Sequence, residues 1–211
     1  MARWFVVLPI IMLIAGCGGG GGGTQYAVDA NYYPLAVGST WTYQFGSNSQ
    51  TLNVVEAIQV NGETGYYLDY GIGGWNPILV SDEEGVRQVA AISSVPAENP
   101  SGEPTVLPEP IIQLQYPLSI GQSWVSIDGP GASRYVTILG VQESIVTPAG
   151  TFANCVKAQI HEVGVLPEHA AETAISYYAP GVGLVRTDAY FSSQEDPVVM
   201  ELISYSLAGG H

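Results

Sequence analysis

Polar and apolar residues alternate one by one along most of this chain, and this alternation constrains the fold more than any other feature. In the segment 40–45, for example, Trp41, Tyr43 and Phe45 alternate with three polar residues. Successive side chains of a β-strand point to opposite faces, so the alternation predicts strands that each bury one face. Helical spacing of apolar residues is almost absent, and the chain is therefore predicted to be all-β.

Turn sequences separate the predicted strands. Asn61-Gly62 lies between the segments 51–60 and 66–70, and Asn-Gly between two alternating segments is a strong hairpin signal. Asp82 to Gly85 marks another turn. We count about ten strands, which predicts a single antiparallel sheet, a half-barrel or a sandwich.

Two segments depart from this pattern. Residues 94–110 contain five prolines and are predicted to form a long surface loop. Residues 167–173 have a composition that favours one or two helical turns.

One segment occurs twice. Residues 33–41 and 116–124 both read Tyr-Pro-Leu-x-apolar-Gly-x-x-Trp, at an offset of 83 residues (116 − 33 = 83). Proline stiffens the approach to a strand, glycine permits a tight turn and tryptophan begins the strand. The repeat indicates either two related halves of one sheet or a strand-entry motif that occurs twice without duplication. Both interpretations place Trp41 and Trp124 in comparable positions.

The start of the chain predicts processing and lipid attachment. Arg3 precedes an apolar stretch at 4–14, and the small residues Ala15 and Gly16 precede Cys17. Eleven apolar residues suit the core of a signal peptide, about 7–15 residues long, and are fewer than the roughly 20 that span a bilayer. This arrangement resembles a lipoprotein signal peptide, which implies removal of residues 1–16 and a diacylglyceryl group on Cys17.

Residues 17–30 are interpreted as the lipidated cysteine with a glycine-rich tether, and residues 31–211 as a single β domain. Gly18 to Gly23 form an unbroken run, which is expected to behave as a flexible coil that holds the domain off a membrane surface. Gly18 replaces the Asp that retains many proteobacterial lipoproteins at the inner membrane. By resemblance to that rule, we expect the bacterial cell envelope as the location and the outer membrane as the attachment site.

The charge of the chain limits its partners. Nineteen acidic residues face five basic ones, a formal net charge of −14. Such a surface repels phosphate backbones, so no nucleic-acid partner is expected. The expected partners are the membrane, through the N-terminal lipid, and an envelope protein or a hydrophobic ligand. We expect no cofactor.

No motif predicts catalysis. The chain contains no Gly-x-Ser-x-Gly nucleophile elbow, phosphate loop or His-Glu-x-x-His sequence. Cys155 and His161 are six residues apart, about 20 Å along a strand, which is too far for a nucleophile and its base. Cys155, with no cysteine partner once Cys17 is lipidated, is expected to be buried and inert. His161 and His169 are weak candidates for a zinc site if the segment between them forms a hairpin.

The aromatic residues are the better indication of binding. Thirteen tyrosines and four tryptophans occur, and several tyrosines form adjacent pairs. In a strand, one member of a pair faces the core and the other faces solvent or a cavity. The candidates for an aromatic binding surface are Trp41, Tyr43, Trp124, Tyr177 and Tyr178.

Three segments together resemble a group of uncharacterised bacterial lipoproteins. These are the Tyr-Tyr-Pro-Leu…Gly-x-x-Trp-x-Tyr opening, the segment Thr147 to Cys155 and the segment Tyr177 to Val185. The resemblance implies a cell-envelope protein with a mostly antiparallel β domain, and it supplies no catalytic residue.

The leading functional hypothesis is therefore a lipid-anchored, non-enzymatic binding or assembly module. The alternatives are a carrier of lipid or lipoprotein with a half-barrel cavity, and a metal-dependent hydrolase.

Overall fold

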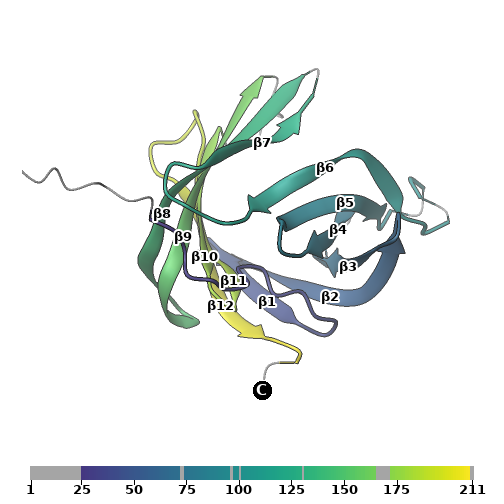
Figure 1. Cartoon of the computed structure of the whole chain (residues 1–211), viewed down its shortest axis with the longest axis horizontal. Coiled ribbons are helices and arrows are strands. Elements are labelled where there is room, and N and C mark those ends of the chain that lie inside the picture. Colours follow the sequence, from purple (N-terminus) through teal and green to yellow (C-terminus); the bar gives the residue numbers. More distant parts are fainter. Residues whose placement is uncertain are drawn as a thin grey trace, which may run out of the picture.

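The computed structural model consists of one curved antiparallel sheet of twelve strands (Figure 1). It describes residues 25–71, 74–95, 97–99, 101–129, 131–164 and 172–209. The order across the sheet is β6-β5-β4-β3-β2-β1-β12-β11-β10-β9-β8-β7. Each strand thus pairs with its neighbours in the sequence, except that β6 and β7 form the two edges and the first strand pairs with the last. The predicted all-β class and single antiparallel sheet are confirmed.

The strands form two successive sets of six. The first set is β1 (Thr40–Phe45), β2 (Asn48–Val60), β3 (Glu63–Asp69), β4 (Trp75–Ser81), β5 (Gly85–Ser93) and β6 (Thr105–Gln115). The second set is β7 (Ser123–Asp128), β8 (Ala132–Thr147), β9 (Gly150–Gly164), β10 (Thr173–Ala179), β11 (Gly183–Tyr190) and β12 (Val198–Ser206).

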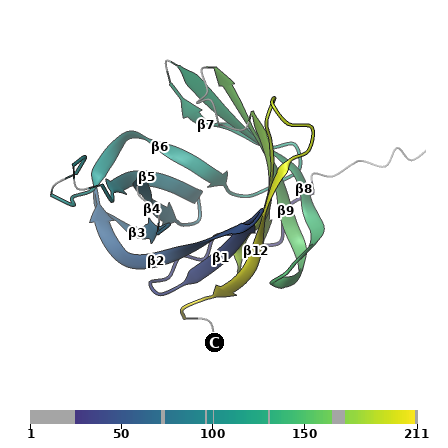
Figure 2. The same cartoon turned by 180° about the vertical axis from the view of Figure 1, so that it is seen from behind.

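The sheet curls into a nearly closed, barrel-shaped wall, and its two edge strands, β6 and β7, each pair with another strand on one side only. Figure 2 shows the wall continuous through β12 and β1 and open between β6 and β7. Two side chains bridge this opening. The indole Nε1 of Trp124 in β7 donates to the carbonyl oxygen of Ile112 in β6 at 3.1 Å, and Gln122 Nε2 donates to the carbonyl oxygen of Gln115 at 2.9 Å.

The count of twelve strands exceeds the predicted ten partly because β6 occupies the proline-rich segment. The prediction of a loop over 94–110 is wrong from Thr105 onward. Pro108 and Pro110 lack the N–H that a central strand would donate to its neighbour. They are tolerated because β6 is an edge strand and because they lie where its pairing with β5 is interrupted, between the pairs Gln88–Ile111 and Ala90–Val106.

The predicted hairpin at Asn61-Gly62 is confirmed. Asn61 and Gly62 have φ angles of 52° and 88°, the positive values that a two-residue type I′ turn requires. They connect β2 to β3, with Val60 opposite Glu63.

The repeated segments lead into the first strand of each half and are folded alike around their glycines, although the Tyr-Pro peptide bond is cis in the second segment only. The N–H groups of Gly38 and Gly121 donate to Val54 and Ile138 at 2.8 and 2.9 Å. These two glycines have φ angles of 93° and 84°, in the left-handed region that glycine favours. A second bond of each segment also matches, from Ser39 N to Ala36 O and from Gln122 N to Ser119 O. The segments therefore occupy equivalent places in two six-strand halves, as expected for related halves.

The inward faces of the strands form the main core. It contains the fully buried side chains of Leu68, Leu114, Ile138, Val185 and Leu202, which come from both halves. The sheet thus encloses its own core, and no second layer is needed to cover it.

Some predictions fall on residues that the structure does not describe. The signal peptide, Cys17 and the glycine run lie within residues 1–24, and most of the predicted helix lies within 165–171. In the part of the chain that the structure does describe, none of the elements is an apolar helix of the length that a bilayer crossing requires.

Candidate functional site

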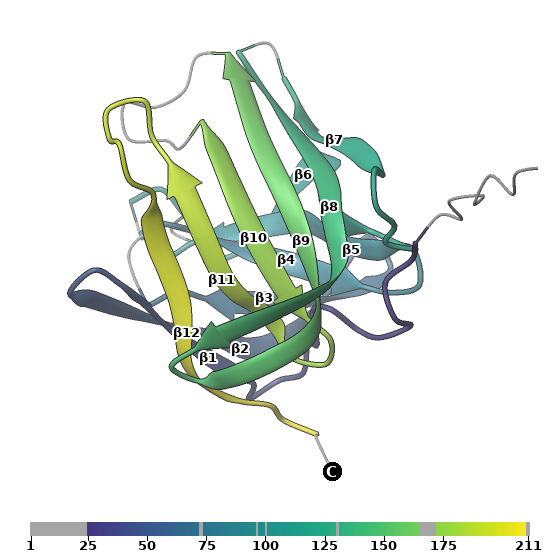
Figure 3. The same ribbon diagram turned by 90° about the vertical axis from the view of Figure 1, so that its left-hand side faces the viewer.

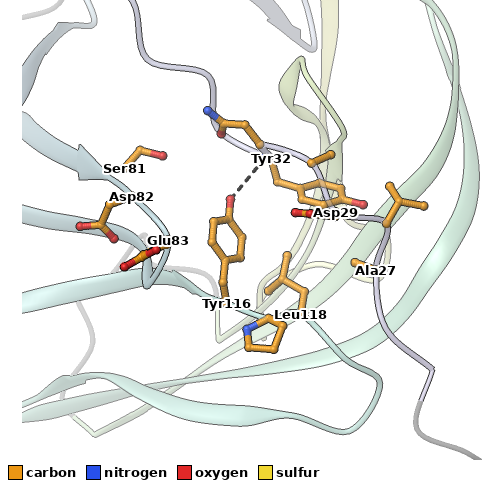
Figure 4. Close-up of a pocket in the computed structure, with 12 residues that line it drawn as sticks. Ala27, Asp29, Tyr32, Ser81, Asp82, Glu83, Tyr116 and Leu118 are labelled. Atoms are coloured by element: carbon orange, nitrogen blue, oxygen red, sulfur yellow. Dashed lines mark hydrogen bonds between the residues drawn. The ribbon is translucent and has the colours of Figure 1, made fainter.

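The candidate site is a half-open cleft of about 470 Å³ between three segments that are far apart in the sequence. One wall is the irregular segment 27–32, the second is the β4–β5 turn at 81–83, and the third is the β6–β7 connection at 116–118. Figure 4 shows Tyr116 and Leu118 on one side, Tyr32 and Ala27 on another, and Asp82 and Glu83 opposite them.

Backbone pairing holds the first and third walls together. Ala27 N donates to Leu118 O at 2.8 Å, and Ile120 N donates to Gln25 O at 3.1 Å. These bonds flank an antiparallel bridge between Tyr26 and Ser119. Residues 25–28, which the sequence groups with the tether, are thereby fixed against the domain.

Two tyrosines form the back of the cleft. Tyr32 is 1% exposed, and its hydroxyl donates to Asn154 O at 3.2 Å. Burial, together with the nearby Cys155 and Tyr116, raises the pKa of Tyr32 to about 12. The Tyr32 N–H in turn donates to the Tyr116 hydroxyl at 3.2 Å. Because that hydroxyl acts as the acceptor, its own proton is available for a ligand in the cleft.

The pKa of Tyr116 is also raised, because burial disfavours the phenolate more than the hydrogen bond from Tyr32 favours it. The Tyr116 side chain is therefore a neutral hydrogen-bond donor at physiological pH.

The acidic rim is built by the turn between β4 and β5. Asp82 Oδ1 accepts from the Glu84 and Gly85 amides at 2.9 and 3.3 Å, and Asp82 Oδ2 accepts from Arg87 at 2.7 Å. Partial burial would raise the pKa of Asp82, but the Arg87 guanidinium and the turn amides outweigh it and lower that pKa. Asp82 is thus an ionised, internally paired carboxylate.

The two other carboxylates of the cleft, Asp29 and Glu83, lie at its exposed rim. Arg87 is committed to Asp82 and Glu63, and no basic side chain is among the described residues that line the cleft. The site thus combines small apolar walls with tyrosine and carboxylate groups. It is suited to neutral or cationic ligands and repels anions.

Three of the five predicted aromatic surface residues lie in the core, so the predicted exposure is wrong for them. Trp41, Tyr43 and Tyr178 are 2%, 7% and 6% exposed. Alternation identifies the two faces of a strand but not which face is buried, and these side chains occupy the inward face of a nearly closed sheet. Trp41 Nε1 and the Tyr43 hydroxyl both donate to main-chain carbonyls near β11, at 2.7 and 3.0 Å.

The two other aromatic candidates are half-buried. Trp124 bridges the β6–β7 opening. Tyr177 faces outward, with Lys157 Nζ 5.8 Å from the centre of its ring. The pair Tyr177–Tyr178 thus divides between the outside and the core as predicted. None of the five predicted residues lines the cleft.

The remaining candidates do not form a common site in the described residues. Cys155 is fully buried, as predicted, and burial together with the nearby Glu143 raises the pKa of its thiol to about 11. His161 is exposed on β9 and bonds Thr173 Oγ1 at 3.2 Å. His169 lies outside the described residues, so its pairing with His161 stays a prediction. Within the described ranges, no three His, Cys, Asp or Glu side chains are grouped as a metal ion would require.

Sequence reasoning did not identify the cleft. Tyr116 begins the second repeated segment and Asp82 begins a predicted turn, so both positions carry a local signal. Their convergence with residues 27–32 depends on how the sheet closes, and neighbouring residues do not encode that closure.

Comparisons with known proteins give a limited result. No protein-family model matches the chain, and no curated protein matches it. Among solved structures, a Bacteroides fragilis protein assigned as exported, with a YmcC-like fold, is 15% identical with a TM-score of 0.45. A Parabacteroides distasonis protein assigned as a lipoprotein is 17% identical with a TM-score of 0.38. Each match covers 84% of this chain and 99% of the other. At these TM-scores the similarity carries no conclusion about this chain.

Proposed function

We propose that this chain is a lipid-anchored protein of the bacterial cell envelope, attached to the outer membrane, whose β domain binds a ligand or partner without catalysis. The anchoring half of the proposal rests on the sequence around Cys17, where a short apolar stretch and two small residues precede a cysteine and a glycine run. In this proposal residues 1–16 are removed, and the thiol of Cys17 carries the lipid.

The observation that carries the binding half is the cleft between segments 27–32, 81–83 and 116–118. Its volume of about 470 Å³ lies in the range of small-molecule sites, about 300–1,000 Å³. Small apolar side chains form much of its wall. The Tyr116 hydroxyl can donate a hydrogen bond that orients a bound ligand. Apolar walls with a few placed polar groups are what a recognition site requires.

The charges of the cleft favour one class of occupant. With Asp29 and Glu83 at the rim and Arg87 already paired, we propose a neutral or cationic ligand, such as a basic peptide side chain. An anionic ligand would be desolvated beside two carboxylates, at a large cost in free energy.

A cleft-filling substitution tests this function. We propose to purify the acylated protein from its native envelope and to measure bound molecules by native mass spectrometry. Ala30→Trp would fill the cleft, whereas Ala97→Trp, in the exposed loop after β5, is the matched control. The proposal expects one stoichiometric bound molecule in the wild-type protein and in Ala97→Trp, and its loss in Ala30→Trp. Retention in Ala30→Trp, or no bound molecule in the wild-type protein, would refute the binding role.

A second candidate, a carrier of lipid or lipoprotein, is favoured by the apolar part of the cleft wall, which includes Ala27, Ala30 and Leu118. The same measurement separates the two functions. A bound acyl lipid would favour the carrier, and a bound peptide or protein would favour the binding module.

A further inference from the structure

An uncharged apolar face covers the outside of β7 and β8. Five large apolar side chains on it are substantially exposed: Tyr26 at 56%, Ile120 at 43%, Val125 at 46%, Tyr135 at 43% and Leu139 at 41%. We call these five residues the β7–β8 face. Scattered exposed apolar residues are ordinary, but a contiguous group marks an interaction surface.

Strand register shows that these residues are neighbours. Val125 of β7 is directly opposite Tyr135 of β8, and Ser123 is opposite Thr137. Val136 and Ile138 of β8 are buried in the core, so residues 135, 137 and 139 point outward.

The N-terminal segment continues the face at one end. The Gly121 amide donates to Ile138 O at 2.9 Å. Ile120 precedes Gly121 and Leu139 follows Ile138, so this bond brings the two residues near each other. The Ile120 amide donates to Gln25 O at 3.1 Å, and Tyr26 pairs with Ser119. Tyr26, Ile120 and Leu139 therefore form one end of the face, and Val125 with Tyr135 forms the other.

The absence of charge distinguishes this face in a strongly acidic protein. The chain carries 24 charged residues (19 acidic and 5 basic), but residues 110–127 and 135–142 contain none. On the neighbouring strand β9, the residues opposite Tyr135 and Thr137 are His161 and Gln159, and the cationic Lys157 is opposite Gly140, next to Leu139. An acidic body is repelled by an anionic surface, but none of the five residues of the face is a carboxylate. The nearest carboxylate in β8 is that of Glu143, which lies over Gly140 at the Leu139 end of the face.

The position of the first described residues indicates which partner this face contacts. Gln25, the first described residue, is bonded to Ile120 of the face, and Figure 3 shows the purple N-terminal segment beginning on the side of the sheet where β7 lies. Cys17 lies eight residues earlier. Eight residues span at most about 29 Å even when fully extended, so lipid on Cys17 would hold this face near the bilayer.

We propose that the β7–β8 face rests on the lipid surface of the membrane and orients the domain there, in place of the sequence-based expectation that the glycine tether holds the domain off that surface. This inference rests on the proposed lipid anchor at Cys17. Tyrosine suits this position because its ring favours the level of the lipid headgroups. Contact through β7 and β8 also covers β7, one of the two edge strands of the sheet.

Depth-dependent fluorescence quenching tests the proposal. The full acylated chain is reconstituted in phosphatidylcholine vesicles. An environment-sensitive dye is placed on Ser119→Cys, next to Ile120 and paired with Tyr26 of the face, or on Ser47→Cys in the exposed turn between β1 and β2. Cys155 is fully buried and does not compete for the dye. Lipids that carry a spin-label quencher are expected to quench the dye at position 119 at least threefold more than at position 47.

A matched pair of double variants isolates the face. Tyr26→Ser with Leu139→Ser should reduce quenching at position 119 to the level at position 47. Trp75→Ser with Val55→Ser, an aromatic and an aliphatic residue exposed elsewhere, should leave it unchanged.

The outcomes separate this inference from the proposed function. A chain that does not float with the vesicles would refute the anchor, and the inference with it. A chain that floats but shows equal quenching at both positions would refute the inference alone. A doubled mass in solution, with a dye at position 119 that is shielded from the lipid quencher, would assign the face to a second copy and also overturn the inference.

Discussion

Gly85 is the position at which the fold should be least tolerant of a single methyl group. It has a φ of 144°, a conformation that is almost restricted to glycine. A Cβ atom there would lie 2.0 Å from the carbonyl oxygen of Leu114 and 3.2 Å from the Cα atom of Gln115. Both contacts are with the backbone of β6, so no side chain can move to relieve them.

The cost of Gly85→Ala follows from two contributions. The unfavourable φ costs about 1–3 kcal/mol. Moving β6 away disturbs the first β5–β6 pairs, Gly85–Gln115 and Val86–Leu114, and each lost hydrogen bond costs about 1 kcal/mol. We therefore expect Gly85→Ala to lower the free energy of unfolding by about 3–5 kcal/mol.

Gly62→Ala is the matched control. Gly62 has a φ of 88°, but nothing lies within 4 Å of the place that an added Cβ atom would occupy. Only the backbone strain remains, about 1–2 kcal/mol. Urea unfolding monitored by tryptophan fluorescence measures both variants. If Gly85→Ala and Gly62→Ala lower the free energy of unfolding by amounts within about 1 kcal/mol of each other, the argument is refuted. The φ angle alone, and not contact with β6, would then explain the need for glycine at position 85.

Three further predictions concern the tryptophans, the thiol and the buried phenols. Trp41→Phe should destabilise the protein by about 2–4 kcal/mol and Trp124→Phe by about 1 kcal/mol in urea unfolding, because the Trp41 side chain is 2% exposed whereas that of Trp124 is half-buried; equal losses would contradict this difference. Cys155 should react with a thiol reagent such as DTNB only on unfolding, since it is fully buried and its pKa is raised to about 11; rapid reaction of the native protein would contradict the burial. Burial raises the pKa of Tyr178 to about 12 and that of Tyr43 well above its ordinary value, so stability is retained below pH 10 and falls as the pH rises through about 12. Absorbance at 295 nm should then show these phenols ionising together with unfolding; their ionisation near pH 10 in the folded protein would contradict the prediction.

The parts of the fold that were predicted correctly are encoded by neighbouring residues. Asn61-Gly62 specifies a two-residue turn by its own backbone preferences, so the β2–β3 hairpin can be read directly from the sequence. The proline-rich segment misled because the effect of proline depends on position in the sheet. Pro108 and Pro110 would break a central strand, but β6 is an edge strand.

The candidate site could not be predicted from the sequence, because its residues are distant in the chain and come together only through the fold. Alternation correctly separated Tyr177 from Tyr178, but it did not show that the inward face of each strand closes around a common core. The cleft needs Tyr32, Asp82 and Tyr116 to converge, and they are separated by 50 and 34 residues (82 − 32 and 116 − 82). Only the closed order of the strands brings these residues together.

The mass of the mature protein extracted from membranes tests the central claim most directly. The account predicts a chain of 195 residues (211 − 16) that begins at Cys17 and carries the added mass of a diacylglyceryl group. An intact N-terminus, or a trimmed one without acyl mass, would contradict the lipid anchor and the membrane orientation inferred from it.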